Sequence, residues 1–335
     1  MRLVVTGGAG FIGSHFVKHL LAGVYPAFRT AHVTVLDKFT YAGSRSNLSE
    51  VIDHPRLTVA EGDICDDPLV ERLLVDADIV VHFAAESHVD RSIAAADSFI
   101  RTNVMGTHCL LAAALRARVA RFVHISTDEV YGSIAGTDRW DEHSPVAPNS
   151  PYSASKAGSD LLALSYYRTH GLPVCVTRCS NTYGSHQHPE KVIPRFVTRL
   201  LRGERVPLYG DGSHVRDWLH VDDHCQGVAL VAADGTPGRV YNIGGGIELS
   251  NRDLTRRILA LLGADWSQVE HVVDRKGHDL RYALTADRIR TELGYRPTVA
   301  FDDGLARTVA WYTRHPEWWE PLCTVDSSRL REVPA

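Results

Sequence analysis

The chain has 335 residues, of which 44% are hydrophobic and 23% charged, and its net charge at pH 7 is −4. This length allows one large α/β domain or two smaller ones that share a core. The charge gives no electrostatic reason to expect nucleic acid or an anionic membrane as a partner, and no apolar run reaches the roughly 20 residues of a membrane helix. The N-terminus does not resemble a signal peptide, so we expect a cytoplasmic protein.

The first half of the chain alternates short β-rich runs with longer amphipathic stretches. Strands are predicted at residues 3–6, 33–36, 57–60, 79–83, 121–126 and 174–177. Helices are predicted between them at residues 11–22, 68–75, 99–116 and 153–170. Nearly continuous apolar strands separated by helices indicate a Rossmann-like α/β fold, with a doubly wound parallel sheet covered on both faces.

After about residue 180 the pattern changes to loops rich in Pro, His and Gly. Short helices are predicted at residues 193–201, 251–262 and 285–293, and a strand at 240–243 is expected to rejoin the sheet. We therefore predict a first domain over residues 1–184, joined by 217–247. A smaller mixed α/β cap domain is expected over 185–216 and 248–323, followed by a flexible tail over 324–335.

A glycine-rich turn joins the first predicted strand to the first helix. Gly7, Gly8, Gly10 and Gly13 allow a tight turn and the close approach of a pyrophosphate to the helix N-terminus, where free N–H groups favour anions. The strand before the turn and the amphipathic helix after it are the context that this motif requires. The turn therefore predicts a dinucleotide-binding domain.

The residue that ends the second strand, Asp37, indicates which dinucleotide is bound. Its carboxylate is placed to accept hydrogen bonds from the adenosine ribose, and its charge would repel the 2′-phosphate of NADP. NAD is the expected cofactor, although Lys38 and Arg45 leave NADP as an alternative. Asp63 and Ile64 are expected beside the adenine, with a helix cap as the other interpretation of Asp63. Ala84 and Ala85 are small enough to let the cofactor lie across the sheet.

Two groups of polar residues carry the expected chemistry. Ser126, Thr127, Asp128 and Glu129 end the fifth strand, on the edge where open α/β sheets bind ligands. Tyr152 and Lys156 are four residues apart on a helix, so the phenol and the ammonium are expected on one face. A nearby cation favours phenolate, so we expect Lys156 to lower the Tyr152 pKa and Tyr152 to act as a general base.

The 18 histidines raise the question of a metal site. His186 and His188 lie in a Pro-flanked loop, and we predict no helical His-x-x-x-His ligand pair. We therefore expect no metal.

The chain resembles the extended short-chain dehydrogenase/reductase family of sugar-nucleotide enzymes over nearly its whole length. The resemblance lies in residues 5–14 (VTGGAGFIGS), 37–43 (DKFTYAG), 84–92 (AAESHVDRS), 126–132 (STDEVYG), 216–221 (RDWLHV) and 293–297 (LGYRP). The sequence departs from the family pattern at Thr182, Ser185 and His186, so the resemblance does not predict the shape of the sugar-facing loop.

The resemblance implies a set of site residues. For the cofactor these are Gly7, Gly10, Phe11, Ile12, Gly13, Asp37, Lys38, Thr40, Asp63, Ile64, Ala84, Ala85, Thr102, Tyr152 and Lys156. For the substrate they are Ser87, Thr127, Asn181, Lys191, Val192, Pro207, Tyr209, Arg216, Asn251, Arg275, His278 and Tyr282. A nucleoside diphosphate needs cations, which Arg216, Arg275 and Lys191 supply.

The resemblance also implies a reaction, the 4,6-dehydration of dTDP-glucose by catalytic residues Thr127, Asp128, Glu129, Tyr152 and Lys156. A 4-keto group acidifies the C5 hydrogen, and loss of water then needs a base and an acid. The family assigns the acid to Asp128, the base to Glu129 and the hydrogen bond to the 4-hydroxyl to Thr127. To act as an acid, Asp128 needs a pKa raised by burial or by the neighbouring Glu129.

Other functions remain possible at this point. A UDP-sugar 4,6-dehydratase would use the same residues, whereas a 4-epimerase needs no acid and base for water loss. A non-catalytic NAD-sensing scaffold would be expected to lack the reactive groups. Helices 99–116 and 153–170 are apolar on more than one face, and in relatives such helices pair, so a homodimer is expected.

Overall fold

The computed structural model describes residues 1–329, with side chains through residue 323. A seven-stranded sheet in the order β3-β2-β1-β4-β5-β6-β10 organises the first half, and all of its strands are parallel. The strands are β1 (Arg2–Thr6), β2 (His32–Asp37), β3 (Leu57–Glu61), β4 (Ile79–His82), β5 (Arg121–Thr127), β6 (Val174–Cys179) and β10 (Val240–Ile243). The predicted doubly wound fold is confirmed, and β10 rejoins the sheet beside β6 as expected.

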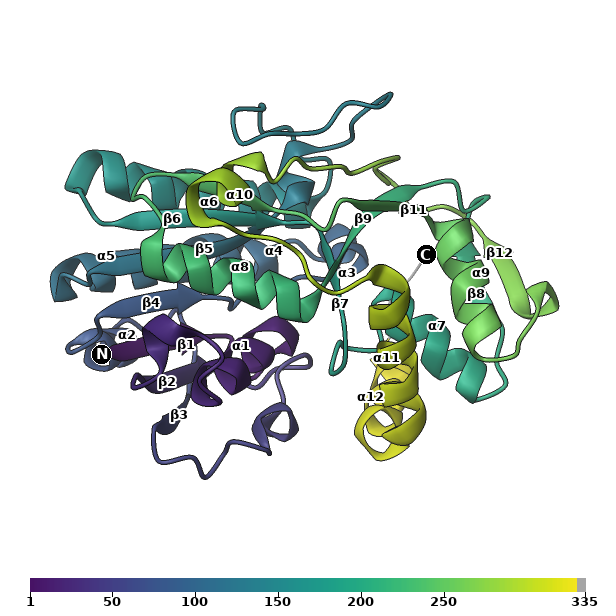
Figure 1. Cartoon of the computed structure of the whole chain (residues 1–335), viewed down its shortest axis with the longest axis horizontal. Helices are drawn as coiled ribbons and strands as arrows, with labels where there is room; N and C mark the ends of the chain where they lie inside the picture. Colours follow the sequence, from purple (N-terminus) through teal and green to yellow (C-terminus); the bar gives the residue numbers. More distant parts are fainter. Residues whose placement is uncertain (330–335) are drawn as a thin grey trace.

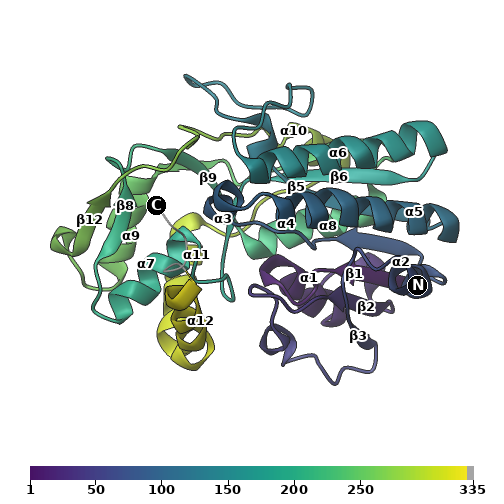
Figure 2. The same ribbon diagram turned by 180° about the vertical axis from the view of Figure 1, so that it is seen from behind.

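Helices cover both faces of this sheet. One face carries α1 (Phe11–Leu21), α8 (Val221–Asp234) and α10 (Asp287–Leu293), which lie in front of the strands in Figure 1. The other face carries α2 (Asp67–Leu74), α5 (Thr107–Ala117) and α6 (Pro151–His170), seen in front in Figure 2. Because the strands are buried on both faces, their sequences are nearly continuous apolar runs.

The helix predicted over residues 99–116 is present within an unbroken helical run over 97–117, but part of that run is π-helical. It consists of α4 (Asp97–Phe99), a π-helical segment at Ile100–Gly106, and α5. Asn103 in the π-helical segment is buried and donates from Nδ2 to the Glu86 carbonyl at 3.0 Å and to Ser155 Oγ at 2.8 Å. The wider turn thus places an amide between the loop after β4 and helix α6, a use of π-helix that is common near functional sites.

The second half builds a smaller unit at the carboxyl ends of the strands (Figure 1). It holds a three-stranded sheet in the order β11-β9-β7 and a β12-β8 pair. Its strands are β7 (Asn181–Tyr183), β8 (Val206–Tyr209), β9 (Val215–His220), β11 (Ile247–Ser250) and β12 (Val269–Val272). Its helices are α7 (Val192–Leu201), α9 (Asn251–Leu261), α11 (Phe301–Arg314) and α12 (Pro316–Arg329). A separate apolar core, which includes Phe196, Trp218 and Tyr312, holds it together.

Short elements complete the chain. They are α3 (Val89–Ala94) and the single turns at Pro26–Phe28, Arg45–Leu48, Asp128–Tyr131 and Trp266–Gln268. Helix α12 covers residues 324–329, where we predicted the start of a tail, and residues 330–335 of that tail lie outside the described part. None of the helices within residues 1–329 combines the length and apolar character needed to cross a membrane.

Candidate active site

The glycine-rich turn has the shape and donors that a dinucleotide needs. Gly7 has φ +68° and a Cβ there would lie 2.5 Å from the Ala84 nitrogen, while a Cβ at Gly13 would collide with the Gly7 carbonyl. Only glycine fits both positions. Helix α1 has no side-chain cap and no acidic residue in its first turn, so the N–H groups of Phe11 and Ile12 face the turn without a competing anion. The site therefore fits a pyrophosphate.

Asp37 ends β2 beside this turn. Its Oδ2 accepts the Ala9 N–H and its Oδ1 the Phe39 N–H, both at 2.9 Å. Each oxygen keeps a second lone pair, which is available to a ribose hydroxyl. Lys38 and Arg45, the cations that could bind the 2′-phosphate of NADP, are paired with carboxylates. Lys38 lies 2.7 Å from Asp63, and Arg45 lies 2.8 Å from Glu61. Because these ion pairs occupy both cations, they favour NAD over NADP.

The other expected cofactor residues surround the same edge. Asp63 is not the cap of α2, since Asp66 holds that position; its Oδ1 accepts the Cys65 N–H at 2.9 Å and its Oδ2 pairs with Lys38. The remaining residues follow the strands or lie in the π-helical segment: Thr40 after β2, Ile64 after β3, Ala84 and Ala85 after β4, and Thr102 at Ile100–Gly106. Gly7 and Ala84 touch, so β1 and β4 open the crevice between them.

The polar residues at the end of β5 form a capped turn that also presents two carboxyl groups. Thr127 Oγ1 accepts the Glu129 N–H at 3.2 Å and donates to Asp128 Oδ1 at 3.3 Å. Asp128 Oδ2 is buried without a hydrogen-bond partner among the described residues. A buried carboxyl in this state favours its protonated form, because the neutral group needs less solvation.

The two carboxyl groups differ in their surroundings. Burial and the neighbouring Glu129 and Asp217 raise the pKa of Asp128 well above its usual value, as predicted. Burial also raises the pKa of Glu129, but the cations Arg275, Arg216 and Lys191 oppose that shift. More cations therefore oppose the rise at Glu129 than at Asp128, which favours the proton on Asp128 over Glu129.

Tyr152 and Lys156 lie in the first turns of α6, and one expectation about them is wrong. Burial raises the pKa of Tyr152 well above 10, Glu129 raises it further, and the Thr127 hydroxyl acts in the opposite direction. The net shift of the Tyr152 pKa is therefore upward and not downward, and Lys156 is not among its main causes. Lys156 Nζ donates to the Ile125 carbonyl at 2.6 Å inside the core. Burial also lowers the pKa of Lys156, to about 8.

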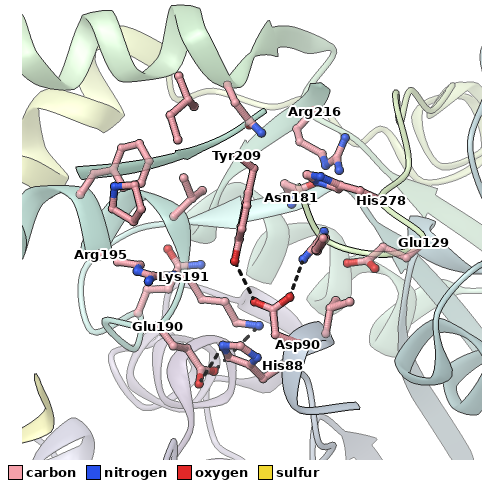
Figure 3. A pocket seen from close by; sticks show the side chains of 18 of the residues that line it. His88, Asp90, Glu129, Asn181, Glu190, Lys191, Arg195, Tyr209, Arg216 and His278 are labelled. Atoms are coloured by element: carbon pink, nitrogen blue, oxygen red, sulfur yellow. Dashed lines mark hydrogen bonds and ion pairs between the residues drawn. The ribbon is translucent and has the colours of Figure 1, made fainter. Parts of the chain in front are cut away.

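Nine of the expected substrate residues line one cavity with Glu129, between the sheet and the smaller unit (Figure 3). They are Asn181, Lys191, Val192, Pro207, Tyr209, Arg216, Asn251, Arg275 and His278. Arg216 Nη2 and Arg275 Nε are buried and have no hydrogen-bond partner within residues 1–329. Two guanidinium groups at one wall, each with one buried nitrogen that lacks a partner, fit the phosphates of a nucleoside diphosphate.

The other expected substrate residues support this cavity from outside its wall. Tyr282 is buried beneath Arg216, whose guanidinium carbon lies 4.3 Å from the ring centroid. The Ser87 carbonyl accepts Lys191 Nζ at 2.6 Å. Thr127 lies behind Glu129.

Sequence reasoning missed several residues that the fold brings into the cavity. They include His88, Asp90, Glu190 and Arg195. Asp90 accepts a hydrogen bond from Tyr209 at 3.4 Å and lies 3.8 Å from Arg275, as Figure 3 shows. These contacts join α3 to β8 and to the loop after β12, which are far apart in the chain. The motif AAESHVDRS contains His88 and Asp90 and was the one available signal.

Comparison with known proteins gives a consistent result. The GDP-mannose 4,6 dehydratase family matches residues 4–308. A dTDP-glucose 4,6-dehydratase of Streptomyces antibioticus is 62% identical over 323 residues, which cover 96% of this chain and 95% of that one. The crystal structure of a Streptomyces venezuelae dTDP-glucose 4,6-dehydratase with NAD and TDP bound has a TM-score of 0.95 at 62% identity, covering 96% and 100%. A Thermus thermophilus UDP-glucose 4-epimerase in complex with NAD has 0.85 at 32%, covering 93% and 99%.

Proposed function

We propose that this chain, which belongs to the GDP-mannose 4,6-dehydratase family, converts dTDP-glucose to dTDP-4-keto-6-deoxyglucose and water with NAD as its cofactor. The observation that carries the proposal is the Asp128–Glu129 pair, two neighbouring carboxyl groups at one strand end with different charged neighbours. Oxidation of an alcohol needs a single base, so this pair adds the acid and base that water elimination requires.

The residues divide the reaction among them. NAD, when bound, accepts the hydride of C4 and returns it to C6 of the same sugar. Tyr152 takes the proton of the 4-hydroxyl, which Thr127 positions by a hydrogen bond. Glu129 then removes the C5 proton that the 4-keto group has acidified, and Asp128 donates its proton to the C6 hydroxyl as water leaves. When the hydride reaches C6, Glu129 returns a proton to C5. Arg216 and Arg275 hold the diphosphate; Asp128 is buried behind the cavity that Glu129 lines.

Direct assay tests this function. Incubation with dTDP-glucose should produce the 4-keto sugar, which is detected by its absorbance in alkali. A parallel reaction with UDP-glucose measures the preference for the nucleobase and the ribose of the substrate. A 4-epimerase would instead form the galactose nucleotide. Absence of the keto product from protein that binds NAD would refute the proposal.

We also propose that the enzyme is a homodimer formed through the π-helical segment, α5 and α6. Ile100, Met105 and Leu161 on these elements are 48–56% exposed, and large exposed apolar groups on neighbouring helices favour self-association. Leu161→Asp should raise the dimer dissociation constant at least about 100-fold, since it buries a charge at the interface. Light scattering reports the mass.

Val75→Asp is the matched control, because Val75 is 68% exposed at the end of α2, outside the proposed interface. Equal dimerisation of the two variants would contradict this interface.

We also propose a domain division and a cellular compartment. Residues 1–184 with 217–247 are proposed as the NAD-binding domain, and 185–216 with 248–323 as the sugar-nucleotide domain. Two separate apolar cores support a division into two units, although α10, within 248–323, packs on the large sheet. The enzyme acts in the cytoplasm. Free thiols support a reducing compartment: Cys175 and Cys179 each donate to a backbone carbonyl.

A further inference from the structure

A cluster of histidines lies on the face of the molecule formed by α1 and α8. His15 and His19 are four residues apart in the helix α1, so they do form the His-x-x-x-His pair that we predicted to be missing. Both rings face Asp222 in the first turn of α8. None of these three residues lines the cavity of the proposed reaction.

The three side chains present ligand atoms at the spacing of a metal site. His15 Nδ1 lies 3.7 Å and His19 Nε2 lies 3.6 Å from the same oxygen, Asp222 Oδ1, and all three atoms are within 4.8 Å of one another. Both distances are too long for a hydrogen bond. They are close to about 3.4 Å, the edge of a tetrahedron whose metal–ligand bonds measure about 2.1 Å.

The hydrogen bonds around the cluster direct lone pairs toward its centre. His15 Nε2 lies 3.0 Å from the Ser185 carbonyl, which can only accept, so Nε2 carries the hydrogen and neutral His15 has its lone pair on Nδ1. His19 Nδ1 lies 3.3 Å from the Tyr25 hydroxyl, which leaves Nε2 toward Asp222. A ligating imidazole whose other nitrogen is held by a carbonyl or hydroxyl is the usual outer arrangement of a metal site.

Two neighbours complete the surroundings. His220 Nδ1 accepts the Asp222 N–H at 3.3 Å and caps α8, so its lone pair is already used and it orients the turn that carries Asp222. Lys18, a cation on α1, lies 3.4 Å from Glu50, and its charge favours the neutral form of His15 and His19, the form that can bind a metal. The side chains of His19 and Asp222 retain 29% and 36% exposure, so an ion can enter from solvent.

We propose that His15 Nδ1, His19 Nε2 and Asp222 Oδ1 bind a divalent transition-metal ion of the Zn²⁺ type, with a solvent-accessible fourth position. Two imidazoles and one carboxylate suit zinc better than Mg²⁺ or Ca²⁺, which prefer all-oxygen sites. The ion would join the helix that follows the glycine-rich turn to the helix that follows β9. Its role is structural, because binding to the folded state alone stabilises that state.

A second group, His214, Asp274 and His278, differs from this cluster. There the Asp274 oxygens lie 3.1 and 2.6 Å from the two imidazoles, which are hydrogen-bond distances, and the rings stack with centroids 3.7 Å apart. Protons therefore fill the space that a metal would need. His278 also lines the proposed substrate cavity, so this group belongs to the site already described.

The test is calorimetric titration of the tag-free, NAD-loaded protein with ZnCl₂, compared with the variants His19→Gln and Asp222→Asn. The original protein should bind one more equivalent of zinc than either variant, or bind it at least tenfold more tightly. Saturating zinc should raise its thermal unfolding midpoint by a few degrees, with no such rise in the variants. His32→Gln, an exposed histidine in β2, is the matched control and should behave as the original protein.

Using two variants guards against a folding defect in one of them. His19→Gln keeps the size and polarity of a half-exposed side chain, and Asp222→Asn is isosteric. Zinc binding of equal stoichiometry and affinity in the original protein and both variants would overturn the site, as would the absence of zinc binding to the original protein. Loss of dehydratase activity on dTDP-glucose would leave this test unaffected, so the two proposals fail separately.

Discussion

Tyr152→Phe is expected to lower the turnover of dTDP-glucose by about 10²–10⁴-fold, the range that a positioned general base contributes. The phenol is buried at the start of α6, and burial raises its pKa. Tyr152 must be ionised to accept the 4-hydroxyl proton, and the positive charge of a bound oxidised nicotinamide would favour that phenolate. Phenylalanine keeps the ring that packs edge-on against Phe99 at a centroid distance of 6.3 Å. Steady-state formation of the keto product measures the effect.

A control on the same helix separates chemistry from folding. Tyr167→Phe makes the same change 15 residues further along α6, where the side chain is 38% exposed, and should leave turnover within about twofold. Both variants should bind NAD as the original protein does, since the glycine-rich turn and Asp37 are untouched. If Tyr152→Phe retained full turnover, another group would have to accept the 4-hydroxyl proton.

Glu129→Gln is expected to stop the elimination step, also by about 10²–10⁴-fold, because the amide cannot take the C5 proton. The sharpest measurement is exchange of the C5 hydrogen with deuterium from the solvent, followed by NMR of the nucleotide sugar. Removal of the base should abolish this exchange together with product formation. Exchange at the original rate would show that another residue removes the C5 proton.

Asp128→Asn provides the contrasting variant for the same pair. It removes the acid and keeps Glu129, so C5 exchange should persist while release of water slows by about 10²-fold or more. With Asp128 present, turnover should fall as the pH rises through the raised Asp128 pKa, because only the protonated group can donate to the C6 hydroxyl. The Asn variant should lack this decline. A decline that survives the substitution would assign the acid elsewhere.

The sequence by itself determined the positions of the strands in the first half of the chain, the class of the fold and the kind of chemistry. Apolar runs, the glycine-rich turn and Asp37 are local signals, because each follows from the pleat of one strand or the geometry of one turn. The choice of reacting groups at residues 126–129 and 152–156 also came from spacing along the chain. The helix at 99–116 was predicted correctly, but its π-helical stretch was not, because Asn103 in that stretch contacts Glu86 and Ser155, which are distant in the chain.

Only the tertiary structure decided how these groups behave. The direction of the Tyr152 pKa depends on burial and on where Lys156 Nζ points, and a spacing of four residues does not specify either. Asp90 meets Tyr209 and Arg275 across long separations in the chain. His15 and His19 gain a third ligand only because α8 places Asp222 beside α1. Local periodicity determines which face a residue occupies, whereas solvation and charge are sums over neighbours that the folded chain brings together.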